Sequence, residues 1–251
     1  MELSSLVNPP YTPSNDATTS RFSAAKWFSF VQSQDVYILG VGGIGSWLSL
    51  MLSRLNPHWI TLTDDDTVEI ENMAGQFFSN DQLGKYKVES ASLNIKYFSN
   101  NYTRVNTFRD RFTEESIIPK VVFCGFDNMQ SRKLVYYKWK RAVQDAPSNT
   151  RKDFLFIDGR LSAETFQVFC ITGDASYYME QYEKDWLFSD EEADSTVCSY
   201  KQTSYCANMI ASVMTNLYVN WCTNHCEPII DRALPFMTEY SAEQLYFRTI
   251  S

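Results

Sequence analysis

The segment VYILGVGGIGSWLSLML, residues 36–52, constrains the fold of this chain more than any other stretch. A short apolar run, Val36 to Leu39, meets a glycine-rich turn, and a helix-like apolar segment follows. The turn carries Gly40, Gly42, Gly43 and Gly45. Glycines permit a tight turn and let backbone amides approach phosphate oxygens, and the amino end of the following helix adds donors and partial positive charge. The pattern predicts a strand, a phosphate-binding turn and a helix, for a nucleotide such as NAD or ATP.

The rest of the chain alternates between strand-like and helix-like patterns. We expect strands over 36–39, 59–63, 104–109, 121–125, 154–159, 164–172, 234–237 and 245–250. We expect helices over 22–32, 44–55, 83–97, 128–143 and 206–222. This alternation predicts an α/β fold, a Rossmann-like, doubly wound and mostly parallel sheet flanked by helices, with strands at its C-terminal end.

The two segments that lack a regular pattern suggest the domain organisation. Residues 1–20 hold three prolines and many Ser, Thr and Asn residues, which is typical of an extended arm. Residues 177–203 are acidic and aromatic with little periodicity, and we interpret them as a mobile crossover segment. We therefore expect one domain over 21–251.

Composition excludes several classes of function. The 30 acidic residues outnumber the 22 basic ones, for a net charge of −8, which argues against general nucleic-acid binding. No apolar run approaches the roughly 18 residues of a membrane span. The N-terminus lacks the basic region and apolar core of a secretory signal. Six scattered cysteines form no compact disulfide framework, which favours a reducing, cytoplasmic location.

Residues downstream of the turn bear on the choice of nucleotide. Asp64 follows the second strand about 20 positions after the turn, where a carboxylate can hold ribose hydroxyls of either NAD or ATP. Lys87 and Asp127 favour ATP. A lysine neutralises phosphate charge that develops in a transition state, and a carboxylate at the end of a strand can bind Mg²⁺.

The ordered set of motifs resembles the ThiF/MoeB/HesA family of adenylating enzymes, which are related to ubiquitin-activating enzymes. The motifs are GVGGIGS, DDDTVEIEN, Gln76, LGKYK and GFDNMQSR, with FIDGRLSAETFQVF and CSYKQTSY similar to the later part of some members. The resemblance runs from about residue 21 to about residue 225. It implies that a C-terminal carboxylate, usually of a ubiquitin-like protein, attacks the α-phosphate of ATP to give an acyl-adenylate and pyrophosphate.

The resemblance also implies a role for each matching residue. It places the phosphate loop on the four glycines, the ribose carboxylate on Asp64 and a neighbouring pocket carboxylate on Asp66. It makes Asn72 and Gln76 polar ligands near the phosphates. It matches Lys87 to the lysine that contacts the phosphates and Asp127 to the aspartate that organises Mg²⁺, and it gives Arg132 a supporting role.

One position departs from the family pattern. The family commonly has an arginine immediately before the glutamine, where this chain has Gly75. Loss of such a preorganised charge can cost roughly 2.7–4 kcal/mol in a transition state. Lys85 could substitute, or Arg21 could arrive from the second subunit of the homodimer that is common in the family. The third explanation is that adenylation is weakened or lost.

The cysteines leave two questions open. The family often carries zinc on two Cys-x-x-Cys pairs, but this chain has no such pair, so we expect no zinc site. Cys198 lies in the crossover segment and is followed by Ser199, as the acceptor cysteine of some activating enzymes is followed by threonine. It is either a thioester-forming nucleophile or an unreactive loop residue.

Three functions remain open on sequence alone. The first is an ATP-dependent adenylyltransferase acting on the C-terminus of a ubiquitin-like protein or peptide. The second is an NAD(P)-binding oxidoreductase, supported only by the glycine turn and Asp64. The third is a non-catalytic relative that binds a nucleotide or a partner protein, for which Gly75 is the argument.

Overall fold

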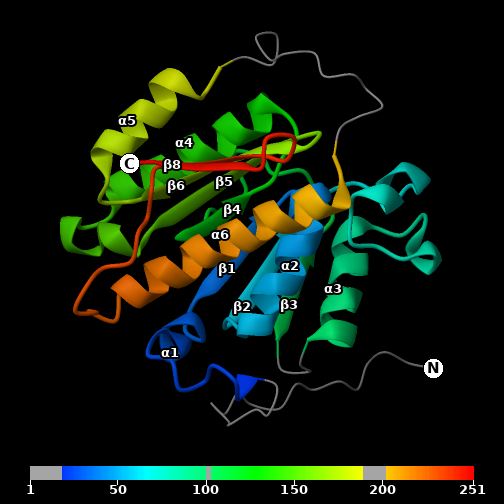
Figure 1. The fold of residues 1–251 in the computed structure, drawn as a ribbon, viewed down its shortest axis with the longest axis horizontal. Coiled ribbons are helices and arrows are strands. Elements are labelled where there is room, and N and C mark those ends of the chain that lie inside the picture. Colours follow the sequence, from blue (N-terminus) through cyan, green and yellow to red (C-terminus); the bar gives the residue numbers. More distant parts are fainter. Residues whose placement is uncertain (1–18, 100–102, 189–201) are drawn as a thin grey trace.

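A single mixed sheet forms the centre of the computed structural model, which describes residues 19–99, 103–188 and 202–251 (Figure 1). Within these residues the strand order is β3-β2-β1-β4-β5-β6-β7-β8. The strands are β1 (Asp35–Leu39), β2 (Trp59–Thr63), β3 (Arg104–Phe108), β4 (Val121–Cys124), β5 (Leu155–Ser162), β6 (Thr165–Thr172), β7 (Met237–Ser241) and β8 (Tyr246–Ile250). The strands from β3 to β5 pair in parallel, and those from β5 to β8 pair antiparallel.

Helices cover both faces of this sheet. They are α1 (Trp27–Val31), α2 (Gly43–Leu55), α3 (Lys87–Phe98), α4 (Met129–Asp145), α5 (Ser176–Asp185) and α6 (Ser204–Asn224), with short 3₁₀ turns η2 (Ile70–Ala74), η3 (Asn80–Gln82) and η4 (Ser148–Asp153). The helices α2, α3 and α6 share one apolar cluster with the sheet, and α4 and α5 share the other. The predicted doubly wound α/β fold is confirmed, with an antiparallel extension at one end.

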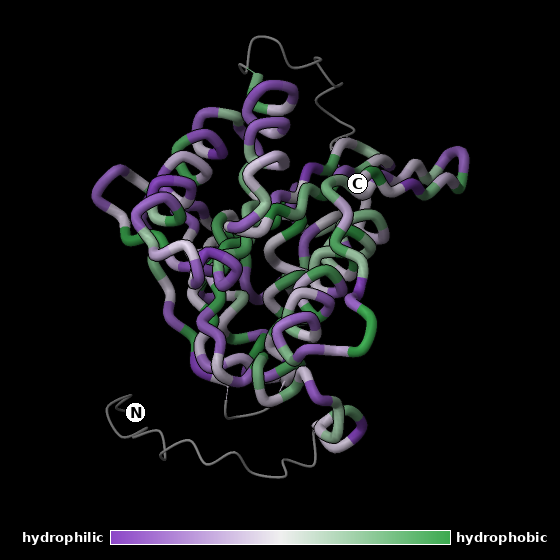
Figure 2. The backbone as a smooth tube through the Cα atoms, turned by 90° about the vertical axis from the view of Figure 1, so that its left-hand side faces the viewer, coloured by the Kyte–Doolittle hydropathy of each residue, from purple (hydrophilic) through white to green (hydrophobic). Residues whose placement is uncertain are grey.

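The central strands are apolar because both of their faces are buried. In β4, Val121 and Phe123 join the cluster under α2 and α6, whereas Val122 and Cys124 join the cluster under α4 and α5. This alternation follows from the two-residue period of a strand. In Figure 2 hydrophobic colours predominate toward the middle of the molecule, and hydrophilic colours mark many of the outer turns.

Two helices begin later in the structure than the sequence pattern predicts. The first helix starts at Trp27 rather than residue 22, because Phe22 and Ser23 both donate to the carbonyl of Thr19 in a turn. The third starts at Lys87 rather than residue 83. There, Gly84 has φ of +76° and Tyr86 pairs with Thr67, so the chain makes a turn and a bridge before α3.

The interpretation of residues 177–203 as one irregular segment is wrong over its first part. Residues 176–185 form α5, and this helix buries Met179 and Tyr182, three residues apart, against the second cluster. The rest of the segment is described only to residue 188 and again from residue 202. The strand expected at 234–237 begins only at Met237, because Pro235 has no N–H to donate to a ladder.

The sheet has its topological switch point between β1 and β4. The chain runs from β1 outward to β2 and β3 on one side, and to β4 and β5 on the other. In open α/β sheets, ligands bind at the carboxyl ends of the strands beside such a point. Across the described parts of the chain, none of the helices is both long and apolar enough to cross a membrane.

Candidate nucleotide site

The glycine turn lies at the switch point and contacts the turn after β4. Gly40 has φ of +88°, and a Cβ on it would lie 2.9 Å from both the carbonyl carbon and oxygen of Gly125. A Cβ on Gly45 would lie 2.0 Å from the carbonyl oxygen of Gly40. Since backbone atoms occupy both positions, these two glycines are required for the turn to close.

The other two glycines of the turn face side chains. A Cβ on Gly42 would meet nothing nearer than the amide nitrogen of Gln76, at 3.8 Å. A Cβ on Gly43, the first residue of α2, would lie 1.7 Å from Oε1 of Gln202. These glycines therefore leave space above the amino end of α2, and Gln202 reaches into part of it.

Asp64 is held directly against the turn. Its Oδ2 accepts a hydrogen bond from the Val41 amide at 2.6 Å, and its Oδ1 accepts one from the Asp66 amide at 2.9 Å. Burial raises the pKa of this carboxyl above 3.8, although Lys87 and the two amides act in the opposite direction. Asp64, the sequence-predicted ribose ligand, is thus fixed beside the glycine turn at the end of β2.

Lys87 and Asp66 form an ion pair next to Asp64. Lys87 is the first residue of α3 and is only 7% exposed, and its Nζ donates to Oδ2 of Asp66 at 2.7 Å. The backbone supports this pair, because the Lys87 amide donates to the Asp66 carbonyl at 2.9 Å. A nearly buried ammonium group therefore stands at the carboxyl edge of the sheet.

The carboxylate oxygens of the three consecutive aspartates after β2 lie close to one another. One oxygen from each of Asp64, Asp65 and Asp66 lies within 4.8 Å of the others, and no second cluster of three metal-ligating residue types occurs within the described residues. Arg111 donates to Asp65 at 2.7 Å from an exposed position. Asp127, the sequence-predicted magnesium ligand, does not belong to this group.

The predicted polar ligands Asn72, Gln76 and Lys85 differ in surroundings. Asn72 is used locally, because its Oδ1 accepts from the Glu69 amide at 2.9 Å and caps η2. Gln76 is only 8% exposed, and its Oε1 has no hydrogen-bond partner within the described structure. Lys85 is exposed in the turn before α3. Of the three, Gln76 is the one that lies buried beside the glycine turn with an unused polar atom.

Asp127 is exposed between β4 and α4. Its Oδ1 accepts from Asn128 Nδ2 at 3.2 Å, and Asn128 in turn caps α4 by accepting from the Ser131 amide at 2.8 Å. Arg132, one turn into α4, donates to the carbonyl of Phe126 and to Asp158. The cap and Arg132 together hold the short segment that carries Asp127.

The structure does not bring Arg21 to this site within one chain. Arg21 is exposed just before α1, and Phe30 of α1 stacks on His225 at the far end of α6, with ring centroids 4.7 Å apart. The helix α6 has 21 residues, which corresponds to about 30 Å. Because α6 begins beside the glycine turn, Arg21 lies at the opposite end of the sheet from its own site.

The cysteines contribute no described group to the site. Cys198, the candidate nucleophile, lies outside the described residues. Cys206 and Cys222 are buried in α6, and burial raises the pKa of the Cys222 thiol. Cys226, just beyond α6, donates to the Cys222 carbonyl at 3.4 Å.

Sequence reasoning missed two features of this region. One is Gln202. The only feature of the sequence that could have indicated its role is Gly75, which faces it and leaves room for its side chain. The other is the buried cluster in which Asp158 pairs with Arg132 and Arg160. Nothing in residue spacing indicated that cluster, because its members come from α4 and β5 and meet only through the tertiary fold.

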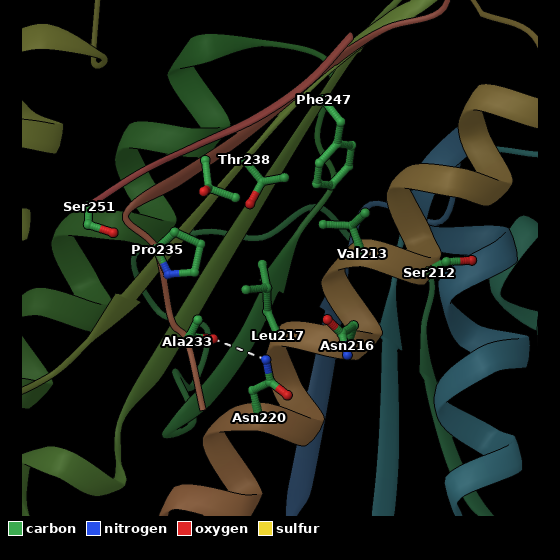
Figure 3. A pocket seen from close by; sticks show the side chains of 11 residues that line it. Ser212, Val213, Asn216, Leu217, Asn220, Ala233, Pro235, Thr238, Phe247 and Ser251 are labelled. Atoms are coloured by element: carbon green, nitrogen blue, oxygen red, sulfur yellow. Dashed lines mark hydrogen bonds between the residues drawn. The ribbon is translucent and has the colours of Figure 1, made fainter. Parts of the chain in front are cut away.

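A separate pocket of about 350 Å³ lies between α6 and the β7–β8 hairpin (Figure 3). Ser212 and Asn216 of α6 line it, and Asn220 donates to the carbonyl of Ala233 at 3.0 Å at its edge. None of the sequence-predicted site residues lines this pocket. It is therefore distinct from the candidate nucleotide site.

Comparison with known proteins shows which family combines this fold with this turn. The ThiF family matches residues 21–250, nearly the whole chain. The chain belongs to the ThiF family. The resemblance inferred from the glycine turn and the later motifs is thereby confirmed.

The ThiF-family relatives in sequence include ubiquitin-like modifier-activating enzyme 5 of two mosquitoes. The protein from Culex quinquefasciatus is 37% identical over 97 residues, which cover 35% of this chain and 24% of the relative. The protein from Aedes aegypti is 33% identical over 132 residues, which cover 46% of this chain and 33% of the relative. This chain spans no more than a third of the length of these two relatives.

The solved structures of two proteins, PaaA and MccB, resemble nearly all of this chain. PaaA matches with a TM-score of 0.70 at 16% identity, covering 98% of this chain and 85% of PaaA. Escherichia coli MccB solved with ATP matches with a TM-score of 0.68 at 14% identity, covering 94% of this chain and 71% of MccB. At these identities the likeness is one of fold.

Proposed function

We propose that this ThiF-family chain is an ATP-dependent adenylyltransferase. It activates the C-terminal carboxylate of a ubiquitin-like or other small protein or peptide as an acyl-adenylate and releases pyrophosphate. The observation that carries the proposal is the nearly buried Lys87, paired with Asp66 at 2.7 Å beside the glycine turn. An NAD-dependent oxidoreductase has no evident use for a cation at that position.

The chemistry assigns a task to each part of the site. The amides at the amino end of α2 bind phosphate oxygens, and Asp64 accepts hydrogen bonds from the ribose. A carboxylate oxygen of the substrate attacks the α-phosphorus, and the bond from that phosphorus to the pyrophosphate oxygen breaks. Lys87 neutralises the negative charge that grows on the phosphate oxygens during this exchange. The amide nitrogen of Gln76, which lies nearest Gly42, can donate a hydrogen bond to a phosphate oxygen.

The carboxylates fit a magnesium ion, which prefers hard oxygen ligands. We assign Asp127 as its principal ligand, and the oxygens of Asp64, Asp65 and Asp66, which lie within 4.8 Å of one another, form a separate group of carboxylates. When bound, Mg²⁺ supplies positive charge to the phosphates and orients them.

Several finer assignments complete the proposal. Lys85 or the Arg21 of a second subunit supplies the charge that Gly75 lacks, and the second source requires a homodimer. Cys198 accepts the activated acyl group if a thioester follows. All of the described cysteines are free thiols, which supports a cytoplasmic location.

A non-catalytic relative is the second candidate, because Gly75 removes a charge from the phosphate site. Calorimetry on the purified protein separates the candidates. We expect ATP with Mg²⁺ to bind at micromolar levels and NAD not to bind. Binding of NAD instead of ATP would make the chain an oxidoreductase, and binding of neither would favour a partner-binding protein.

Asp127→Ala tests the metal assignment. The wild-type chain should bind ATP more tightly with Mg²⁺ than without it, and Asp127→Ala should lose this difference, on the order of tenfold to a hundredfold. Asp145→Ala is the matched control, because Asp145 is an exposed aspartate at the other end of α4. A variant with the wild-type magnesium response would exclude Asp127 as the ligand. With an identified carboxylate substrate, the same variant should lose pyrophosphate exchange.

A further inference from the structure

Gln202 enters the nucleotide site from the segment that precedes α6. Its backbone forms a parallel bridge with Ala163, directly after β5, so the base of the side chain has a fixed place. Figure 1 shows the chain entering α6 beside the amino end of α2. From there the carboxamide reaches Gly43, where a Cβ would lie 1.7 Å from Oε1 and 2.7 Å from Cδ of Gln202.

The other side of the same side chain lies on Gly75. A Cβ on Gly75 would lie 2.8 Å from Cγ and 3.0 Å from both Cδ and Nε2 of Gln202. Gly75 is itself held in place, because its carbonyl accepts from the indole N–H of Trp47 at 3.0 Å. Gln202 thus occupies the space that any side chain at position 75 would enter.

We infer that Gln202 is a phosphate-positioning residue that takes over the place vacated at Gly75. Its carboxamide contacts the phosphates of the bound nucleotide at the amino end of α2. The inference rests on the proposed ATP site and deepens it by naming a neutral donor where the family commonly has an arginine. The donor is Nε2, which lies 3.3 Å from the position of a Cβ on Gly43 and 3.0 Å from that of a Cβ on Gly75, and it can bond phosphate oxygens without adding charge. Gly75 and Gln202 are therefore one functional unit.

The contact predicts how substitutions combine. The atoms that a Cβ on Gly75 would meet belong to a flexible side chain, so Gly75→Ala displaces Gln202 and leaves the backbone intact. Gly75→Ala and Gln202→Ala should therefore cause the same defect, and the double variant should be no worse than either single one. At a glycine that faces backbone atoms, such as Gly45, an alanine would instead displace the backbone.

The experiment is calorimetric titration of each variant with ATP and Mg²⁺, and separately with adenosine, which carries no phosphate. We expect Gln202→Ala to weaken ATP binding about tenfold to a hundredfold, the range for a hydrogen bond to a charged group, and to leave adenosine binding unchanged. Gln202→Glu keeps the shape but sets a carboxylate against phosphate, so it should bind ATP more weakly than Gln202→Ala. Gln244→Ala, an exposed glutamine in the β7–β8 turn, is the control.

Each other outcome overturns the inference. Unchanged or tighter ATP binding by Gln202→Ala would mean that the side chain ignores or obstructs the phosphates. Additive losses in the Gly75→Ala and Gln202→Ala double variant would mean that the two positions act independently. Equal losses for ATP and adenosine, with a lowered Tm, would make the role structural. A wild-type chain that binds no ATP would overturn the proposed function itself, and this role with it.

Discussion

Two aspartates on this sheet sit in charged clusters of opposite character. Asp158 in β5 is completely buried, and its oxygens accept from Arg132 Nη1, from Arg160 Nε at 2.8 Å and from the Tyr182 hydroxyl at 2.8 Å. Asp64, after β2, is partly exposed and accepts from two backbone amides. The first carboxylate is enclosed by polar and charged side chains, whereas the second is held by backbone amides and is only partly buried.

The pKa values of the two carboxyls shift in opposite directions. Burial acts to raise the pKa of Asp158, but Arg132 and Arg160 outweigh it, and the pKa is lowered. At Asp64 burial is the largest influence and Lys87 does not compensate for it, so the pKa is raised. The closed cluster consists of Asp158, Arg132, Arg160 and Tyr182. It favours the ionised form of Asp158, and this ionised carboxylate stabilises the fold. The open cluster consists of Asp64, Asp66 and Lys87. It leaves the negative charge of Asp64 poorly compensated, as is common where a protein binds a cation or a ligand.

Breaking the closed cluster should have the largest effect on stability. Arg132 is 6% exposed and donates to Asp158, to the carbonyl of Gly159 at 3.0 Å and to the carbonyl of Phe126. Arg132→Ala leaves these acceptors without that partner, so we expect the free energy of unfolding to fall by about 3–5 kcal/mol. Urea denaturation measures it.

The control for this prediction is Arg141→Ala, because Arg141 is an exposed arginine on the same helix. Its loss should change the free energy of unfolding by no more than about 0.5 kcal/mol. Similar values for the two variants would show that the buried cluster contributes no more than a surface charge. The comparison between the clusters would then fail.

A smaller change tests the same cluster more finely. Tyr182→Phe removes the hydroxyl that donates to Asp158 at 2.8 Å and accepts from Arg160 Nη2 at 3.1 Å, while the side chains of Arg132 and Arg160 remain. We expect a loss of about 1.5–3 kcal/mol in the free energy of unfolding, since the bonds removed are made to charged groups. Tyr177→Phe on the same helix is the control, because Tyr177 is well exposed. Equal losses in the two variants would mean that the bond to Asp158 has no special weight.

The contrast between the clusters also explains what could be predicted from sequence. The residues of the open cluster follow strands directly, as Asp64 follows β2, or begin helices, as Lys87 begins α3. Parallel strands bring their carboxyl ends to one edge, so a local pattern is enough to place such residues together. The same reasoning predicted the doubly wound sheet, because alternating strands and helices leave few other arrangements.

Residues that meet only through tertiary packing escaped this reasoning. Arg132 and Asp158 lie 26 residues apart on elements of different type, and no spacing rule connects them. Gln202 reaches Gly43 and Gly75 because the chain returns to the sheet edge before α6, which no periodicity reveals. The helix α5 was missed for a related reason, since its buried face has only Met179 and Tyr182 among polar neighbours.

The smallest expected effect is on the pH dependence of stability. There the two aspartates should differ in the sign of the slope of stability against pH. A raised pKa means that the contribution of Asp64 to stability is present below the ordinary value of 3.8 and is lost as pH rises through the folded value. Asp64→Asn cannot ionise, so its stability relative to wild type should increase as pH rises from about 3 to about 6.

Asp158→Asn should show the opposite slope, because its lowered pKa contributes stability that is present above 3.8 and lost as pH falls through the folded value. The stability of this variant relative to wild type should therefore decrease as pH rises. Urea denaturation of both variants and wild type across the same pH range measures the two slopes. Slopes of the same sign would mean that one electrostatic environment serves both carboxyls. Opposite slopes would show that ionisation of Asp64 lowers the stability of the fold, whereas ionisation of Asp158 raises it.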